Sequence, residues 1–401
     1  MDVSSGLLGL VLGAVLGLGL SVAFEDRLKV AIGRLVRRLR SRGLKGSSTV
    51  RRDTFAIGPL TTSMVIVEGD GENPIPENAI SISIDHAPVA LPKEMARWRE
   101  QVAAEMETAR TSGGKPVWNG PNYAIAAFSI SRDPLVESPE IFLRLQHSDY
   151  YTFLTTQQLD RAFLDGTTPR SRYIDSFENL TDVPAFMASS FGTNMAVVTK
   201  DLYLVVSRRS NLVGTSPNLW SSSANEALSR SIDSKGRDVP NLYDVARRGL
   251  AEELAIDRTE CRLDMLAFTI DVKTHQWGGL FIARLPELTM KGLRARWTRG
   301  VSDRWEHAEH AFIPFTVKAV GEYVLDPARV SAWTSVGPPL YYLALVNQYG
   351  RPTVEHGMAD VVKRAAHSGE RRVRHLIPWQ RMPKVFGRSG RPSPPSSSVE
   401  T

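Results

Sequence analysis

The stretch that most constrains the fold is residues 241–257, NLYDVARRGLAEELAID, which predicts one amphipathic helix. Asn241 belongs to the residue types that cap helix N-termini, and Asp244 complements the positive end of the first turn. The apolar residues recur at helical spacing: Val245, Leu250 and Leu254. This stripe is expected to fix the helix to a core by one face.

Runs of β-forming residues on both sides of this helix predict a mixed sheet. Residues 195–210 indicate two strands about a turn at Lys200 and Asp201. Further strands are expected at residues 63–67, 80–84, 124–130, 140–145, 263–272, 279–285 and 311–317. Residues 93–110 and 338–348 have helical composition. The expected class is α/β.

Two adjacent carboxylates stand late on the central helix, close behind an arginine. The residues concerned are Arg248, Leu250, Glu252, Glu253 and Ile256. Together they resemble the second half of the Nudix box, the Arg-Glu-aliphatic-x-Glu-Glu-x-Gly-aliphatic signature of hydrolases of nucleoside diphosphates linked to another group. The resemblance covers roughly residues 190–330. It implies a Nudix-like α/β/α sandwich with a mixed sheet. The residues before it are expected to form an α+β N-terminal domain and one transmembrane helix.

The chain departs from this signature at three positions. Gly249 stands where the signature has a glutamate, Ala255 stands at its glycine, and Pro240 stands where its upstream half has a glutamate. A carboxylate at position 249 would lie on the helix face of Glu252 and Glu253 and reach the same metal ion. Its absence leaves a metal with few protein ligands.

The resemblance also implies roles for individual residues. Glu252 and Glu253 would hold Mg²⁺ or Mn²⁺. Glu253, Glu306 or Glu309 would orient or deprotonate the attacking water. Four further residues would contact the substrate or brace the helix: Arg208, Arg209, Trp220 and Arg248.

Three interpretations remain open on these residues. The first is a metal-dependent hydrolase of a nucleoside diphosphate-linked compound. The second is an inactive nucleotide-binding sensor coupled to self-associating membrane helices, as in a bacterial signalling or defence effector. The third is a structural domain in which Glu252 and Glu253 belong to a solvated helix face. Nucleic acid is not an expected partner, because no stacking aromatic pattern accompanies the basic segments.

Residues 6–24 form an uncharged run of 19 residues, which as a helix would be about 28 Å long. This length predicts one membrane span. The basic residues follow the run, whereas in a cleaved signal peptide they precede it. Residues 27–45 are rich in Arg and Lys, so the positive-inside rule predicts a single-pass protein of the cell membrane with its soluble part in the cytoplasm.

Gly9, Gly13 and Gly17 recur every four residues within this run and would form a small-residue face. Such a face favours close helix packing, so a homo-oligomer is expected; the alternative is that glycine is merely frequent in membrane spans. The basic amphipathic segment after the run would lie on anionic lipid or pack on the soluble part.

The expected organisation has five parts. They are a membrane anchor at 1–25, a basic helix and linker at 26–54, an α+β domain of unknown role at 55–190, a Nudix-like domain at 191–360 and a basic, Pro/Ser-rich disordered tail at 361–401. The single cysteine, Cys261, rules out disulfides within the chain and indicates a reducing compartment.

Overall fold

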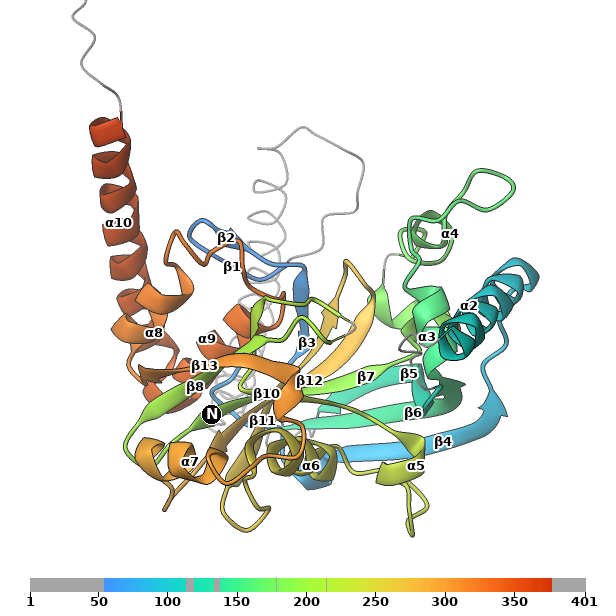
Figure 1. The fold of residues 1–401 in the computed structure, drawn as a ribbon, viewed down its shortest axis with the longest axis horizontal. Helices are drawn as coiled ribbons and strands as arrows, with labels where there is room; N and C mark the ends of the chain where they lie inside the picture. Colours follow the sequence, from blue (N-terminus) through green and yellow to red (C-terminus); the bar gives the residue numbers. More distant parts are fainter. Residues whose placement is uncertain (1–53, 113–118, 133–137, 178, 214, 377–401) are drawn as a thin grey trace, which may run out of the picture. The chain divides into compact units, whose positions relative to one another are not determined.

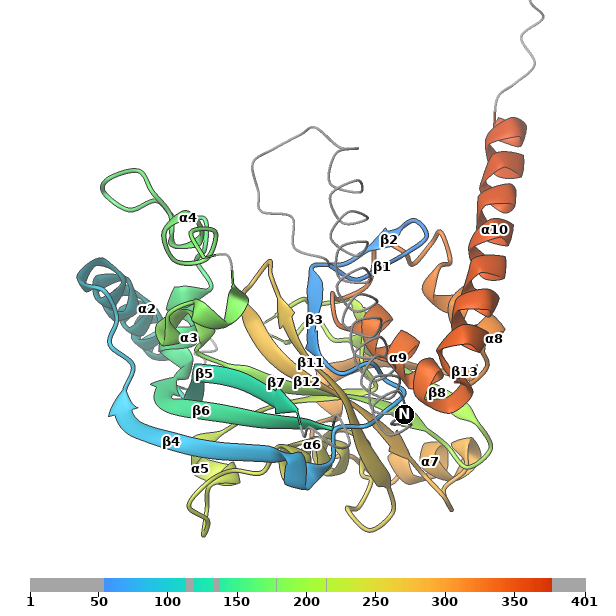
Figure 2. The ribbon, with the colours of Figure 1, turned by 180° about the vertical axis from the view of Figure 1, so that it is seen from behind.

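The computed structural model describes residues 54–112, 119–132, 138–177, 179–213 and 215–376, and Figures 1 and 2 show its ribbon from two sides. The strands are β1 (Ala56–Ile57), β2 (Leu60–Thr61), β3 (Met64–Glu68), β4 (Ile80–Pro88), β5 (Pro121–Arg132), β6 (Pro139–Asp149), β7 (Phe191–Val198), β8 (Tyr203–Arg209), β9 (Trp220–Ser221), β10 (Ala224–Ala227), β11 (Arg262–Asp271), β12 (Gln276–Arg284) and β13 (His307–Pro314).

The helices are α2 (Lys93–Thr111), α3 (Tyr150–Thr156), α4 (Pro169–Tyr173), α5 (Arg230–Asp233), α6 (Leu242–Leu254), α7 (Met290–Trp297), α8 (Val317–Val324), α9 (Gly337–Tyr349) and α10 (Arg351–Leu376). Short 3₁₀ turns are η1 (Glu77–Ala79), η2 (Leu180–Asp182), η3 (Ala185–Ala188) and η4 (Arg304–Glu306).

An eight-stranded mixed sheet forms the centre of the fold. Its main path runs β13-β8-β7-β12-β11-β3, while β10 pairs with β7 and β9 pairs with β8. The β7 and β12 pair is parallel and the other neighbours are antiparallel. Because β10 and β8 pair with successive parts of β7, both lie on the same side of that strand.

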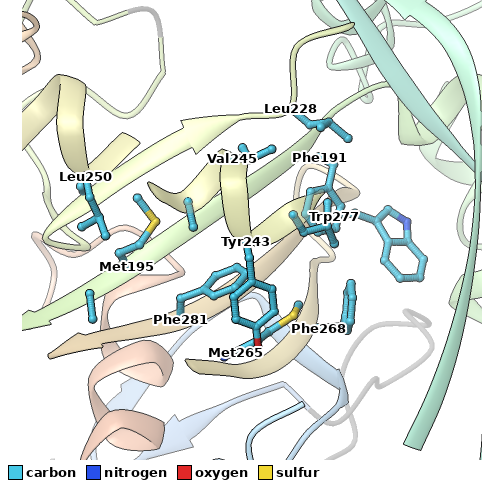
Figure 3. Close-up of a cluster of buried hydrophobic side chains, with 14 of the residues drawn as sticks. Phe191, Met195, Leu228, Tyr243, Val245, Leu250, Met265, Phe268, Trp277 and Phe281 are labelled. Carbon is cyan, nitrogen blue, oxygen red and sulfur yellow. Dashed lines mark hydrogen bonds between the residues drawn. The ribbon is translucent and has the colours of Figure 1, made fainter. Parts of the chain in front are cut away.

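The predicted central helix is α6, and it covers one face of this sheet. Asn241 caps it as expected: its Oδ1 accepts hydrogen bonds from the backbone N–H groups of Tyr243 (2.9 Å) and Asp244 (3.2 Å). Val245 and Leu250 are fully buried. Figure 3 shows them with the strand side chains of the same apolar cluster: Phe191, Met195, Phe268 and Phe281.

The opposite face of the sheet is covered by α9. The buried residues Leu340, Tyr341 and Ala344 of this helix belong to one cluster with Ala196 of β7 and Leu280 of β12. Helices α8 and α10 contribute Val320 and Val354 to the same cluster. Helix α10 continues to Leu376, beyond the expected domain end at 360.

A second sheet has three strands in the order β4-β6-β5, with β4 parallel and β5 antiparallel to β6. It shares its core with the large sheet, because Phe128 of β5 lies 5.2 Å from Phe268 and 5.0 Å from Trp277 between ring centroids. A third sheet is the short pair β1-β2.

The observed class is a mixed α/β fold with several sheets, and the predicted fold class is corrected on two points. Strand β3 pairs with β11 of the large sheet, so the residues before 190 do not form an α+β domain that simply precedes a sandwich. The described residues all belong to one compact unit. The physical reason is that an apolar strand pattern does not indicate which other strand it will pair with. Here the partner, β11, lies about 200 residues further along the chain.

The second correction concerns the transmembrane helix of the predicted fold class. Among the helices in the described ranges, none is both long and apolar enough to cross a membrane. The run at 6–24 with Gly9, Gly13 and Gly17, and the basic segment after it, lie outside the described residues.

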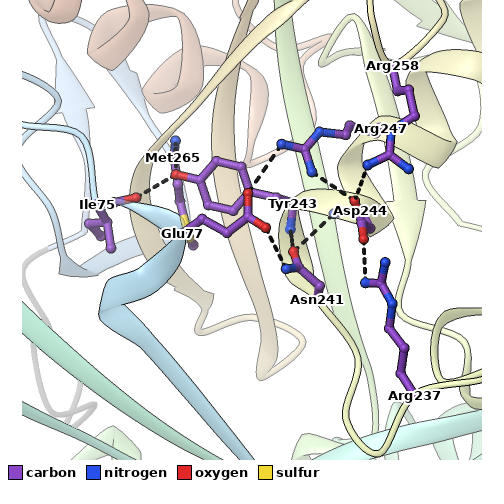
Figure 4. Close-up of polar contacts among 9 residues, drawn as sticks. All are labelled: Ile75, Glu77, Arg237, Asn241, Tyr243, Asp244, Arg247, Arg258 and Met265. Carbon is purple, nitrogen blue, oxygen red and sulfur yellow. Dashed lines mark hydrogen bonds and ion pairs between the residues drawn. The ribbon is translucent and has the colours of Figure 1, made fainter.

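A polar network joins the segment after β3 to the start of α6 (Figure 4). The Tyr243 hydroxyl donates to the carbonyl of Ile75 at 2.6 Å and accepts from the N–H of Met265 at 3.2 Å. Glu77 accepts from the Asn241 side chain at 2.6 Å and pairs with Arg247 at 3.2 Å. Residues 75–77 are thereby held against both α6 and β11.

Candidate functional site

A polar cleft of about 200 Å³ lies on the α9 face of the large sheet, at the end that α9 leaves uncovered. Gly192 and Asn194 alternate with the α6-facing residues of β7 and therefore share the face of Ala196. The cleft is lined by Met64, Phe153, Gln157, Gly192, Thr193, Asn194, Arg209, Thr215, Ser216, Ser221, Asn225, Glu226, Ala227, Thr269, Asp271, Thr274, Gln276, Trp277, Gly278, Thr334, Ser335 and Val336. Most of these side chains carry an amide, hydroxyl or carboxyl group, which can fix the orientation of a polar ligand.

Glu253, the second carboxylate of the predicted pair, is buried on α6 and does not itself line the cleft, but it contacts the lining residue Asn225. Its side chain is 2% exposed. Oε1 accepts a hydrogen bond from the backbone N–H of Asn225 at 2.9 Å, and Oε2 lies 2.6 Å from Nε2 of His307. Helix α6, strand β10 and strand β13 therefore meet at one carboxyl group.

The pKa values of Glu253 and His307 move in opposite directions. Burial raises the pKa of Glu253 to about 8, although the Asn225 N–H and Arg209 oppose this rise. Burial lowers the pKa of His307 to about 4. Near neutral pH the proton therefore lies on Glu253, which donates to Nε2 of His307. The imidazole hydrogen is then on Nδ1, which is buried and without a partner in the described part of the chain.

Glu306 and Arg209 lie near this pair. Burial, followed by the neighbouring Glu253, raises the pKa of Glu306 to about 7. Burial lowers the pKa of the Arg209 guanidinium, whereas Glu306 and Glu253 act in the opposite direction. Arg209 also lines the cleft and is held by a 3.0 Å hydrogen bond from Nε to the carbonyl of Thr215. It is thus the residue that links the buried acids to the cleft.

Arg248 is fully engaged within the protein. Its Nη2 lies 3.0 Å from Asp233, and its Nη1 lies 3.0 Å from Glu226 and 3.4 Å from Glu252. Burial raises the pKa of Glu226 to about 8, and the negative charges of Glu253 and Glu252 add to this rise. Of the two roles considered for Arg248, bracing the helix is the one that these contacts perform.

Glu226 of strand β10 occupies the space beside Gly249, where the Nudix signature has a glutamate on the helix. A Cβ at Gly249 would lie 2.7 Å from the Cβ of Glu226 and 2.9 Å from Cε of Met195. Position 249 therefore needs glycine because β10 packs directly on α6. Glu226 brings a carboxyl group to the same helix face from β10.

The other predicted site residues lie elsewhere. Arg208 pairs with Glu309 at 3.7 Å, and both side chains are largely exposed. Trp220 is buried in the cluster below α9, with its ring centroid 5.7 Å from that of Tyr323 and 6.5 Å from that of Trp333. The structure therefore brings Glu253, Glu306 and Arg209 together and separates them from Arg208, Glu309 and Trp220.

The donor set can be tested against the divalent cation that the resemblance implies. Both oxygens of Glu253 are bound to protein groups, and Glu252 and Glu226 share the positively charged Nη1 of Arg248. A guanidinium thus occupies the position between these two carboxylates. Within the described ranges no cluster of three His, Cys, Asp or Glu side chains has the geometry of a metal site. This arrangement does not fit Mg²⁺ or Mn²⁺ held by Glu252 and Glu253.

Several residues of the site are not predicted by the sequence. His307 and Glu226 carry no signal of their own, because their spacing from α6 along the chain follows no known pattern. The cleft residues Asn194, Asp271 and Gln276 lie on three different strands. Only the pairing of those strands brings them together, so no local pattern could have identified them.

Comparisons with known proteins give little further information. No family model matches the sequence, and no curated protein matches it. Among solved structures, the chain is similar to the crystal structure of DR0079 from Deinococcus radiodurans. The match has 16% sequence identity and a TM-score of 0.27, and it covers 39% of this chain and 82% of that chain. A likeness at this level carries no argument about function.

Proposed function

We propose that this chain binds a nucleotide-type small molecule in the polar cleft and leaves it intact. The observation that carries the proposal is the state of Glu253, whose two oxygens are bound to Asn225 and His307 in a buried position. A glutamate that is buried and keeps its proton near neutral pH is a poor metal ligand and cannot deprotonate a water. Binding without turnover is therefore the function we propose for the cleft, whose lining residue Asn225 contacts this glutamate.

Arg209 is the group that would recognise a phosphate. Among the described residues that line the cleft it is the only cation. Its Nε is fixed by Thr215, so the guanidinium is held in place before a ligand arrives. A preorganised guanidinium matches the geometry of phosphate oxygens and loses little side-chain entropy on binding.

Titration calorimetry on the full-length chain tests this proposal with adenosine 5′-monophosphate (AMP), adenosine diphosphate and ADP-ribose. Each titration is done with Mg²⁺ and again with EDTA, and equal affinities are expected. Arg209→Gln should weaken binding by roughly tenfold to a hundredfold, because a charge-assisted hydrogen bond contributes about 1.5–3 kcal/mol. Arg208→Gln is the matched control: this neighbouring arginine pairs with Glu309 outside the cleft, so its loss should leave the affinity unchanged.

Equal effects of the two arginine substitutions, or binding of none of the three compounds, would refute binding in the cleft. The hydrolase interpretation has its own signature in the same samples. It requires release of a nucleoside monophosphate from ADP-ribose that depends on Mg²⁺ and is lost in Glu253→Gln. Release of this kind would show that the proposal of intact binding is wrong.

A further inference from the structure

The two ends of the cleft carry opposite charge. Arg209 stands at the end of β8, and Asp271 stands at the end of β11. The path from β8 to β11 crosses β7 and β12, which makes at least three strand steps of about 4.8 Å each, or about 14 Å. Glu226, the other carboxyl group of the lining, is paired with Arg248. A ligand that fills the cleft therefore meets a cation at one end and a carboxylate at the other.

Asp271 is fixed for this role by its own hydrogen bonds. Its Oδ1 accepts from the N–H of Lys273 at 2.9 Å, and its Oδ2 accepts from the hydroxyl of Ser335 at 2.5 Å. Ser335 stands just before the N-terminus of α9, so the carboxylate also complements the positive end of that helix. Each carboxylate oxygen can accept a further hydrogen bond, and an ionised carboxylate has no hydrogen to donate.

The floor between the two ends is flat. Gly192 of β7 and Gly278 of β12 are directly paired, and both line the cleft. A Cβ at Gly278 would lie 2.9 Å from the carbonyl oxygen of Gly192. Asn194 and Gln276 flank this floor with carboxamide groups, which donate and accept hydrogen bonds. A planar, uncharged and polar group fits such a surface.

We infer that the cleft binds a nucleoside phosphate across the strands, with its phosphate at Arg209 and a base that carries an exocyclic amino group at Asp271. This inference rests on the proposed function and adds the ligand's direction and its base class. An amino group donates to the carboxylate. A keto group in the same position presents a second acceptor to Asp271, and the nearest donor is then the adjacent ring N–H, displaced from that position.

The test uses two pairs of probes that differ by an amino or a keto group, AMP against inosine monophosphate and cytidine against uridine monophosphate. The full-length chain should bind the amino member of at least one pair about tenfold more tightly, in line with the cost of one mismatched base contact. Asp271→Asn should reduce this preference to within about threefold, because a carboxamide both donates and accepts. Asp264→Asn, on the same strand but paired with Arg284, should preserve it.

The outcomes separate this inference from the proposed function. Binding that depends on Arg209 but shows no amino preference in either pair would overturn the inference and leave the proposed function standing. A preference that persists in Asp271→Asn would also overturn it. Binding that is insensitive to Arg209→Gln, or no binding of the four probes, would overturn both. The probe pairs report on the unchanged chain, so the inference stays testable even if Asp271→Asn fails to fold.

Discussion

At the scale of single residues, Glu253 and His307 form a buried pair that shares one proton. Because both side chains are 2% exposed, ionising either one is costly. Between pH 4.5 and 6.5 the folded chain holds a proton on Glu253 that the unfolded chain releases, while His307 gains a proton only on unfolding. These two effects oppose each other in that window.

Above pH 6.5, Glu253 is the only member of the pair whose protonation changes on unfolding, so it alone makes the free energy of unfolding depend on pH. A glutamate whose pKa is raised by folding stabilises the native state at low pH, and this stability is lost as the pH rises to its folded pKa of about 8. The free energy of unfolding should therefore fall between pH 6.5 and 8. Glu253→Gln should make the free energy of unfolding depend less steeply on pH, by about 1.4 kcal/mol per pH unit, because one titrating proton is removed. Urea denaturation at several pH values measures both slopes.

Glu322→Gln is the control for this slope. The Glu322 side chain, on α8, is 50% exposed and pairs with Lys318 and Arg364 away from the Glu253–His307 pair, so its loss should preserve the pH dependence of the wild-type chain. If Glu253→Gln leaves the slope as steep as in the wild type, the proton is on His307 and the pair is ionic. Glu253 would then be ionised and would not be held in a neutral hydrogen bond.

At the scale of elements, α6 shows what a local pattern predicts and what it omits. Its capping residue, Asn241, and its apolar stripe are predicted correctly, because both depend on neighbours within one or two turns. The helix ends at Leu254, and its C-terminal cap is Ala255, the position of the signature's glycine, with a φ of 55° in the left-handed region that favours glycine. The close contact of Gly249 with β10 could not be predicted, because Glu226 belongs to a separate element earlier in the chain.

Substitution of Gly249 tests this contact. In an open helix, Gly→Ala adds about 1 kcal/mol of stability. Gly249→Ala should instead destabilise the chain by roughly 1–3 kcal/mol, because the new Cβ would overlap the Cβ of Glu226 and force β10 away from α6. In Gly292→Ala, on α7, the nearest atoms are the movable Cδ1 of Leu288 at 3.0 Å and Oγ1 of Thr289 at 3.4 Å, an ordinary contact distance, so the change should be neutral or stabilising. Urea midpoints compare the two variants, and a stabilised Gly249→Ala would refute the contact.

At the scale of the whole molecule, the large sheet is assembled from distant parts of the chain. The pattern at residues 63–67 predicts a strand, and β3 is found at Met64–Glu68, yet nothing in that pattern indicates its pairing with β11. Period-two alternation identifies a strand and its buried face, but it contains no information about which edge the strand will join. The cleft has the same origin, since its polar residues come from strands that only the complete sheet brings side by side.

Tyr243 is the point where this long-range assembly can be tested. Its hydroxyl joins the carbonyl of Ile75 to the N–H of Met265 in a buried position (Figure 4). Tyr243→Phe should lower the free energy of unfolding by roughly 1–3 kcal/mol, because both backbone groups lose a partner. Amide hydrogen exchange should become faster at residues 64–79, which this link holds to the sheet, and remain slow in α9 on the opposite face. Tyr203→Phe, in β8, is the control for loss of a hydroxyl. Equal acceleration of amide exchange in residues 64–79 and in α9 would mean that these hydrogen bonds stabilise the whole core and not specifically the pairing of β3 with the sheet.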